Sequence, residues 1–269
     1  MNCAGLDVGS RTIKLVMFDS DVGESLVLET GVNPLRRCQE LLSSRSFERL
    51  VVTGYGRHLV APVLRAELVS EIGAYAVGTR YLYADCRTVI DIGGQDSKAI
   101  SLSNSGEVQK FEMNDRCAAG TGKFLEVMAD TLEVNIRDLG DLALSASRVV
   151  HINSLCTVFA ESEVVSLIAR GEESSAIALA LHEAISTRIV GMLRRVGVRE
   201  KVVFAGGGAL NSCLCKLLKQ KLGVQLVVPP QPQTVGALGA VLLAKRGDRW
   251  GYGLARKSYG LHLSDKEDK

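Results

Sequence analysis

The stretch Leu6-Asp7-Val8-Gly9-Ser10-Arg11-Thr12-Ile13-Lys14 recurs in outline 84 residues later as Ile90-Asp91-Ile92-Gly93-Gly94-Gln95-Asp96-Ser97-Lys98. In both copies an apolar segment leads into an Asp, a turn containing glycine follows, and a Lys stands seven residues after the Asp. Glycine supplies the backbone conformations that such tight turns require. An internal repeat of this kind predicts two copies of one β-hairpin, and therefore a duplicated core.

The segments around the two copies predict an α/β protein. Apolar and β-branched runs favour strands at 3–8, 12–19, 25–30, 49–53, 88–92, 97–102, 106–113, 201–205 and 224–228. Helical periodicity favours helices at 34–44, 69–82, 121–132, 158–170, 174–196 and 233–245, with a further helix ending at 222. The alternation indicates two similar lobes with a cleft between them. We expect a first lobe of residues 1–85 plus 233–269, whose tail from Gly247 is polar, and a second lobe of residues 86–232.

The two Asp-containing hairpins together predict a nucleotide site. Asp7 and Asp91 are expected to face a common cleft, where paired carboxylates can hold a hydrated Mg²⁺ and orient an attacking water. Turns rich in Gly and Ser expose backbone N–H groups to phosphate oxygens. Lys14 can neutralise phosphate charge, whereas the role of its counterpart Lys98 stays open. The first phosphate loop would comprise Gly9, Ser10, Arg11, Thr12 and Lys14, and the second Gly93, Gly94 and Gln95.

A third glycine-rich element follows the strand at 201–205, where Gly206, Gly207 and Gly208 lead into a helix. Glycine lets the backbone approach a base or a ribose closely. We expect these three glycines and Asn211 to contact adenosine, with Gln231 and Gly236 bordering the base. The segment Gly120-Thr121-Gly122-Lys123 imitates only part of a Walker loop, and Thr121, Gly122 and Lys123 are expected on the nucleotide side of the cleft. Any one of these elements alone is weak evidence for a nucleotide site, but their combination in this order favours nucleotide binding.

Composition excludes several other classes of protein. The 269 residues are 46% hydrophobic and 23% charged, which is ordinary for a globular protein. A net charge of +2 gives no reason to expect nucleic acid or an anionic membrane as a partner. The N-terminus lacks the pattern of a signal peptide, and the apolar stretch at 235–244 is about half of a membrane span. A cytoplasmic location is therefore expected.

Four longer motifs resemble one family. They are Val52-Thr53-Gly54-Tyr55-Gly56-Arg57, Val89-Ile90-Asp91-Ile92-Gly93-Gly94-Gln95-Asp96, Met113-Asn114-Asp115-Arg116-Cys117-Ala118-Ala119-Gly120-Thr121-Gly122 and Cys156-Thr157-Val158-Phe159-Ala160-Glu161-Ser162-Glu163. With the paired hairpins and the triple glycine, they resemble the activators of 2-hydroxyacyl-CoA dehydratases and the ATP-hydrolysing subunits of benzoyl-CoA reductase. These proteins belong to the ASKHA superfamily of actin, sugar kinases and heat-shock-70 ATPases. The resemblance covers Gly5 to about Lys245 and implies the duplicated, ribonuclease H-like two-lobe α/β fold with a nucleotide cleft between the lobes.

Two of the seven cysteines stand apart. Cys117 and Cys156 each lie just before a predicted helix, whose N-terminus stabilises negative charge. An iron–sulfur cubane takes four thiolates, so two per chain would make half a site on the axis of a twofold dimer. The resemblance implies this arrangement, a [4Fe–4S] cluster that bridges a homodimer. Buried, inert thiols are expected at the other five, Cys3, Cys38, Cys86, Cys213 and Cys215.

The resemblance further implies an ATPase that binds ATP or ADP with Mg²⁺ and drives electrons onto a partner iron–sulfur enzyme. That partner would be a 2-hydroxyacyl-CoA dehydratase or a related reductase, with ferredoxin or flavodoxin as the electron donor. Two alternatives are a small-molecule kinase on the same fold and a non-catalytic protein of actin type. The kinase alternative leaves Cys117 and Cys156 unexplained, and ATP turnover would argue against the actin-type alternative. Surface or packing roles are expected for Arg57, Glu71, His151 and Glu161.

Overall fold

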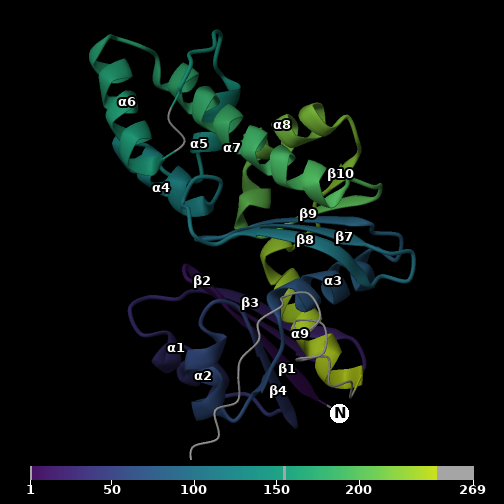
Figure 1. The fold of residues 1–269 in the computed structure, drawn as a ribbon. Coiled ribbons are helices and arrows are strands. Elements are labelled where there is room, and N and C mark those ends of the chain that lie inside the picture. Colours follow the sequence, from purple (N-terminus) through teal and green to yellow (C-terminus); the bar gives the residue numbers. More distant parts are fainter. Residues whose placement is uncertain (1, 154–155, 247–269) are drawn as a thin grey trace, which may run out of the picture.

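Two mixed, five-stranded sheets form the framework of the computed structural model, which describes residues 2–153 and 156–246 (Figure 1). Sheet A has the strand order β3-β2-β1-β4-β5, and sheet B has the order β10-β9-β6-β7-β8. The strands of sheet A are β1 (Cys3–Val8), β2 (Thr12–Phe18), β3 (Val22–Glu29), β4 (Arg49–Thr53) and β5 (Glu67–Leu68). Those of sheet B are β6 (Thr88–Ile92), β7 (Ser97–Leu102), β8 (Val108–Asn114), β9 (Val202–Ala205) and β10 (Leu226–Val227).

The predicted duplication is confirmed strand by strand. In each sheet the first three strands pair antiparallel and the last two join in parallel, so that β1 to β5 correspond to β6 to β10. Asp7 pairs with Lys14 across the first hairpin, and Asp91 pairs with Lys98 across the second. The equal spacing in the sequence thus becomes an equal register in the two sheets. We call residues 7–14 the first Asp hairpin and residues 91–98 the second Asp hairpin.

Helices cover both faces of each sheet, which explains why β1 and β6 are buried along their whole length. On sheet A, α1 (Pro34–Leu42) and α2 (Arg57–Leu64) pack on one face and α9 (Val235–Arg246) on the other. On sheet B, α4 (Gly122–Thr131), α5 (Leu139–Leu144), α7 (Ser174–Val196) and α8 (Ser212–Leu222) pack on one face and α3 (Glu71–Leu82) on the other. The short 3₁₀ helices η1 (Gly207–Leu210) and η2 (Pro232–Thr234) complete the second half.

Helices α3 and α9 are exchanged between the two sheets. Helix α3 follows the last strand of sheet A but packs on sheet B, and α9 follows the last strand of sheet B but packs on sheet A. The two helices contact each other between the sheets (Figure 1). A Cβ atom built on Gly239 would lie 1.7 Å from the Ala74 carbonyl oxygen, so the backbones touch directly. The lobe limits expected from the sequence stay a prediction, and the tail from residue 247 lies outside the described residues.

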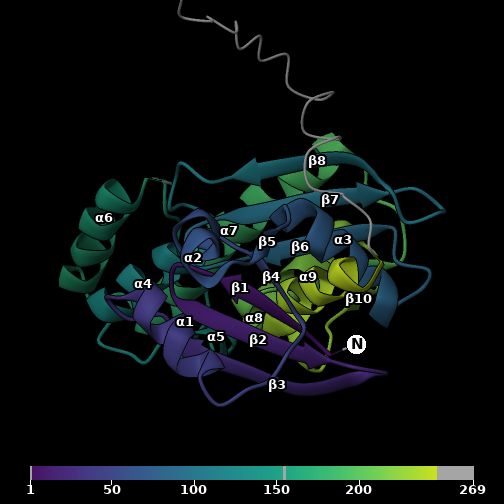
Figure 2. The ribbon, with the colours of Figure 1, turned by 90° about the horizontal axis from the view of Figure 1, so that it is seen from below.

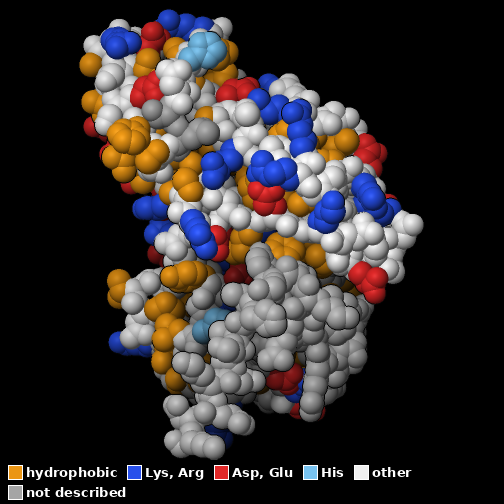
Figure 3. Space-filling view, in the orientation of Figure 1, with side chains coloured by type: hydrophobic (Ala, Val, Ile, Leu, Met, Phe, Trp, Pro, Cys, Tyr) orange, Lys and Arg blue, Asp and Glu red, His pale blue; other side chains and the backbone are white. Residues whose placement is uncertain are grey.

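Helix α6 (Thr157–Ala169) is the most exposed of the long helices. Only Ala160 and Val164 are buried, and it packs on α4 and α7 at the outer edge of the protein (Figures 1 and 2). Apolar side chains gather on its surface, where Val158 and Phe159 are each 67% exposed (Figure 3).

The longest apolar helix is α7, not the segment at 235–244. By length and composition α7 could span a membrane, but 67% of its apolar window is buried inside the fold. His182 and Ser186 lie on its buried side. We therefore describe α7 as the central core helix of the half that contains sheet B.

Candidate functional site

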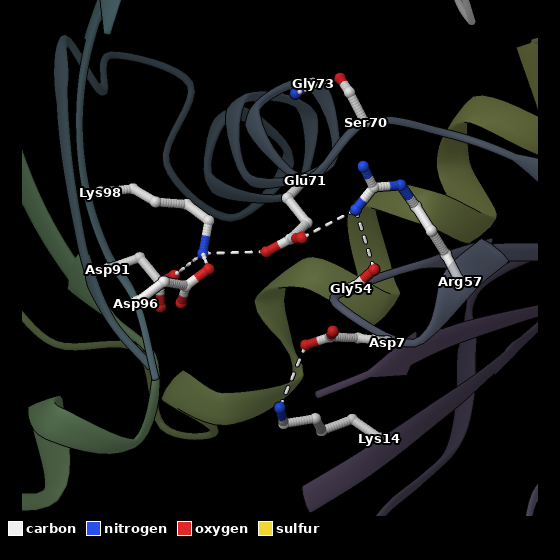
Figure 4. Close-up of polar contacts among 10 residues, drawn as sticks. All are labelled: Asp7, Lys14, Gly54, Arg57, Ser70, Glu71, Gly73, Asp91, Asp96 and Lys98. Atoms are coloured by element: carbon white, nitrogen blue, oxygen red, sulfur yellow. Dashed lines mark hydrogen bonds and ion pairs between the residues drawn. The ribbon is translucent and has the colours of Figure 1, made fainter. Parts of the chain in front are cut away.

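Asp7 and Lys14 form the polar end of the first Asp hairpin. Asp7 is 5% exposed, and its Oδ2 lies 3.2 Å from Nζ of Lys14 (Figure 4). The hairpin is closed by the backbone N–H of Gly9, which donates to the carbonyl of Thr12. Burial raises the pKa of Asp7, and the nearby Lys14 ammonium opposes this rise. One cation therefore faces one buried carboxylate at this hairpin.

The second Asp hairpin is more highly charged. Nζ of Lys98 lies 2.9 Å from Asp91 Oδ2, 2.8 Å from Asp96 Oδ2 and 2.9 Å from Glu71 Oε2 (Figure 4). Burial alone would lower the pKa of Lys98, but the three carboxylates together raise it well above its usual value. Burial raises the pKa of Asp96 to about 6, against the opposing effect of Lys98. Lys98 thus neutralises protein carboxylates, a role that the repeat alone did not reveal.

Glu71 and Arg57, for which only surface or packing roles were expected, belong to this network. Glu71 is the first residue of α3, and its Oε1 accepts from Nη1 of Arg57 at 3.0 Å. The same Arg57 nitrogen donates to the carbonyl of Gly54 at 2.9 Å (Figure 4). Tyr75, one turn later in α3, has a strongly raised pKa because of burial and the nearby Asp91 and Asp7 carboxylates. Glu71 of α3 therefore connects the second Asp hairpin, through Arg57, to the Gly54 turn after β4, and no local sequence pattern predicts this contact between distant segments.

A glycine of positive φ faces the Asp of each hairpin. Gly54 follows β4 with φ +92°, and a Cβ atom there would lie 2.4 Å from Asp7 Oδ1. Gly206 follows β9 with φ +80°, and its Cβ atom would lie 2.1 Å from Asp91 Oδ1. Both positions therefore exclude side chains for two reasons, backbone conformation and space. The triple-glycine turn and the Gly54 turn are the same element in the two halves.

The turns of the two hairpins approach each other. A Cβ atom on Gly94 would lie 3.0 Å from Ser10 Oγ and 2.6 Å from Arg11 Cγ. Nε of Arg11 donates to Glu126 Oε1 of α4 at 2.6 Å, which ties the first hairpin to the other half of the protein. Thr12 begins β2, and Gln95 is exposed at the second turn. The predicted phosphate-binding residues are thus brought together.

The start of α4 is bonded to the second hairpin. The backbone N–H of Gly122 donates to the Gly93 carbonyl at 2.8 Å, and that of Lys123 donates to the Gly94 carbonyl at 2.7 Å. Thr121 is fully buried, and its hydroxyl donates to the Ala118 carbonyl. The segment 121–123 therefore lies at the turn of the second Asp hairpin, and its place on the nucleotide side of the cleft stays a prediction.

The residues expected near the adenosine lie in or at the start of four elements, η1, α8, η2 and α9. Gly207 and Gly208 lie in η1, and Asn211 caps α8 by accepting from the N–H of Leu214 at 2.9 Å. The Asn211 amide also contacts His182 Nε2 at 2.9 Å, so its side chain has structural partners. Gly236, near the start of α9, lies beside Asp7, and a Cβ atom there would be 3.2 Å from Asp7 Oδ2. Gln231 accepts a hydrogen bond from Ser25 of β3 and so lies against sheet A.

Four of the five cysteines expected to be buried are buried, whereas the fifth, Cys215, is half-buried like Cys117. Cys3, Cys38, Cys86 and Cys213 are buried, Cys215 and Cys117 are half-buried, and Cys156 is exposed. Burial raises the pKa of Cys38, Cys86 and Cys213 to about 11 and also raises that of Cys215. Cys117 lies in the loop before α4, and Cys156 is the N-cap of α6, the neighbouring helix. No group of three or more metal-ligating side chains occurs among residues 2–153 and 156–246.

These residues fit the groups that the sequence implies. Oδ1 of Asp91 is buried and has no hydrogen-bond donor within the described part of the chain, so an oxygen-binding cation such as Mg²⁺ would satisfy it. Cys117, in the loop before α4, and Cys156, the N-cap of the neighbouring α6, are one half-buried and one exposed thiol, which is half of the donor set of a cubane. A cavity of about 680 Å³ lies elsewhere, between β8, α7 and residues 149–153.

Comparison with known proteins agrees with this geometry. The (R)-2-hydroxyglutaryl-CoA dehydratase activating ATPase of Acidaminococcus fermentans is 40% identical over 250 residues, which cover 89% of this chain and 95% of that protein. The solved structure of the activator of the 2-hydroxyisocaproyl-CoA dehydratase from Clostridium difficile with bound ADPNP is 37% identical, with a TM-score of 0.84. That match covers 91% of this chain and 94% of the activator.

A more distant likeness shows the fold alone. A ROK family glucokinase from Streptomyces griseus matches with a TM-score of 0.59 at 10% identity, covering 92% of this chain and all of that one. The fold is therefore the duplicated ASKHA fold of actin, hexokinase and heat-shock-70 proteins. Residues 4–244 match the BadF/BadG/BcrA/BcrD ATPase family. With both Asp hairpins, the glycine turns and nearly the whole length matched, this chain is an ATPase and belongs to the BadF/BadG/BcrA/BcrD ATPase family.

Proposed function

We propose that this ATPase activates a 2-hydroxyacyl-CoA dehydratase, or a related reductase, by delivering low-potential electrons to it. The observation that carries the proposal is the position of Cys117, in the loop before α4, and of Cys156, at the N-cap of α6. The two helices contact each other, and α4 is hydrogen-bonded to the second Asp hairpin. A small-molecule kinase needs no such thiols. The named activators among the relatives support the choice of partner.

Within this proposal the two Asp hairpins hold the phosphates. Asp7 and Asp91 would ligate Mg²⁺ through water and orient the attacking water molecule. Lys14, which has a single carboxylate partner among the described residues, Asp7 at 3.2 Å, is the lysine that can turn towards a phosphate. Lys98 is held by three carboxylates and instead keeps the carboxylate cluster in place. Gly206 to Gly208 would approach the adenosine, with Asn211, Gln231 and Gly236 around it.

The thiolates of Cys117 and Cys156 would hold half of a [4Fe–4S] cluster, which supplies one-electron transfer when bound. A second copy of the chain would supply the other two thiolates. The exposed Val158 and Phe159, directly after Cys156, support a contact between copies at this edge. We further propose a cytoplasmic location and ferredoxin or flavodoxin as the electron donor.

The test is anaerobic purification of three variants, Cys117→Ser, Cys156→Ser and the control Cys215→Ser. Iron per dimer and the visible absorbance of the cluster are measured. The first two variants should lose the cluster, and the control should keep it because Cys215 lies on α8, away from α4 and α6. A full cluster in either of the first two would refute the assignment.

The kinase alternative is separated by the fate of the γ-phosphate. An ATPase releases inorganic phosphate without any acceptor, whereas a kinase would turn over ATP only when a small hydroxyl or carboxyl acceptor is added. Asp7→Asn should abolish phosphate release in the former case and leave the iron content unchanged.

A further inference from the structure

The loop that carries Cys117 is held at both ends. We call residues 115–121 the Cys117 loop; it joins the end of β8 to the start of α4. At its far end, Gly122 and Lys123 donate to the carbonyls of Gly93 and Gly94 in the second Asp hairpin, at 2.8 and 2.7 Å. One end of the loop is therefore hydrogen-bonded directly to that hairpin.

The near end of the loop is held by one side chain, that of Asn114. Its Nδ2 donates to the carbonyl of Cys117 and to the carbonyl of Ala119, both at 2.9 Å. Its Oδ1 accepts from Nη2 of Arg188 on α7 at 3.3 Å. Only this orientation of the amide pairs every donor with an acceptor, because two carbonyl oxygens and a guanidinium face it.

Two further contacts fix this arrangement. Asn114 is the last residue of β8 and pairs with Ser97, the first residue of β7, which lies within the second Asp hairpin. The Arg188 side chain crosses the loop at Gly120, where φ is +87° and a Cβ atom would lie 3.0 Å from Arg188 Cδ. Both ends of the Cys117 loop are thus connected to the second Asp hairpin, one end through α4 and the other through Asn114.

We infer that Asn114 is a positioning residue that couples the second Asp hairpin to the Cys117 thiol, and that Arg188 holds Asn114 in place. The inference rests on the proposed function for the role of Cys117. It assigns the coupling to side-chain hydrogen bonds on the loop and not to α4 alone. If α4 alone carried the movement, Asn114 could be changed without effect on the thiol.

The first test uses the protein without any cluster, so it does not depend on whether iron binds. The rate of Cys117 alkylation by iodoacetamide is followed by peptide mass spectrometry, with ADP and with ADPNP. In the native chain the rate should differ between the two nucleotides. Asn114→Leu removes both hydrogen bonds to the loop, which should raise the rate about tenfold and bring the ratio between nucleotides close to one.

Two variants control the interpretation. Asn114→Asp keeps the shape and the acceptor for Arg188 but loses the donors, so it should behave like Asn114→Leu. Arg195→Gln breaks the ion pair of Arg195 with Glu112, which also joins α7 to β8 but does not touch the loop. It should leave both the rate and the ratio unchanged.

The outcomes separate the inference from the proposed function. A native nucleotide response in both Asn114 variants, with unchanged nucleotide affinity, would overturn the coupling role. Equal alkylation rates with ADP and ADPNP in the native chain would overturn it as well. Iron content and the cluster's reduction potential are then measured in the same variants. The potential should lose its dependence on nucleotide in the Asn114 variants, while a native chain that binds no iron would refute the proposed function alone.

Discussion

The lysines of the two Asp hairpins are equivalent by repeat but not by environment, and replacing each with methionine tests this difference. Lys98→Met keeps a long side chain at a position that is 2% exposed and removes the cation shared by three carboxylates. Glu71 retains Arg57 at 3.0 Å, whereas Asp91 and Asp96 lose the ion pair that the described contacts give them. The local charge changes from −1 to −2, because Lys98 and Arg57 face three carboxylates before the change and only Arg57 remains after it.

The expected magnitudes follow from burial and the number of partners. Breaking a buried ion pair by removing one partner costs about 3–5 kcal/mol of the free energy of unfolding. Lys14 is 13% exposed in its side chain and has one carboxylate partner at 3.2 Å. Loss of a single hydrogen bond to a charged group costs roughly 1.5–3 kcal/mol. We therefore expect Lys98→Met to be less stable than Lys14→Met by about 2 kcal/mol, taking the centres of these ranges.

The assay is equilibrium urea unfolding of both variants and the native protein without nucleotide, at pH 6.5 and pH 8. Raised carboxyl pKa values in the folded state contribute stability that is present at low pH and is lost as pH rises through the folded pKa. In the native protein the pKa of Asp96 is raised to about 6, so its contribution falls between about pH 4 and 6 and is then level. Without the Lys98 ammonium the pKa of Asp96 should rise further, so the loss of its stabilising contribution should continue above pH 6.5. The difference in free energy of unfolding between the native protein and Lys98→Met should therefore widen towards pH 8.

ATP turnover, in contrast to stability, should depend more directly on Lys14 than on Lys98. Lys14→Met should reduce ATP turnover in a protein that is still folded, whereas Lys98→Met should act first on stability. Equal losses of stability in the two variants, or a Lys98→Met deficit that shrinks as pH rises, would refute the assignment of structural charge compensation to Lys98.

Further expectations concern the glycine turn and the buried thiols. Gly206→Ala should lower the free energy of unfolding by roughly 2–5 kcal/mol, because backbone strain and overlap of the new Cβ atom with Asp91 add. The control Gly197→Ala, at φ +86° with open space around it, should lower it by only about 1–2 kcal/mol. Equal losses for the two variants in urea unfolding would contradict the overlap. The buried thiols should react with a disulfide reagent at pH 8 on the order of 100 times more slowly in the folded protein than in urea, since their pKa is about 11 instead of 9.0. These thiols are those of Cys38, Cys86 and Cys213. If peptide mapping located rapid labelling at any of them in the folded protein, their burial would be contradicted.

Much of the fold could be predicted because the repeat fixes pairs of elements at once. The strands at 3–8, 49–53, 88–92 and 97–102 and the helix at 174–196 are confirmed at the predicted limits. Helix α2 was missed because it is short and contains Pro62, a residue that argues against a helix interior. Helix α5 and strand β5 are shorter still and leave little periodicity to detect.

The site was predictable where its residues are local and not where they are distant. Asp7, Asp91 and the glycines can be recognised in the sequence by their positions within a hairpin or turn. Glu71 and Arg57 have no comparable sequence pattern, because their contacts form only when α3 packs on sheet B. The contrasting partners of Lys14 and Lys98 have the same origin, since the repeat describes the hairpins and the asymmetry comes from α3.

The exchange of α3 and α9 has a consequence for how the chain can be divided. Each half covers only one face of its own sheet, so a fragment ending after β5 would expose the apolar face that α9 occupies, and the later half would lack the cover that α3 provides. The halves are therefore expected to unfold in one cooperative transition, although the chain contains two repeats. The arrangement is also that of two copies of a single repeat that trade a terminal helix, now joined in one polypeptide. In this protein duplication produced two interdependent halves, and an isolated half is not an independent folding unit.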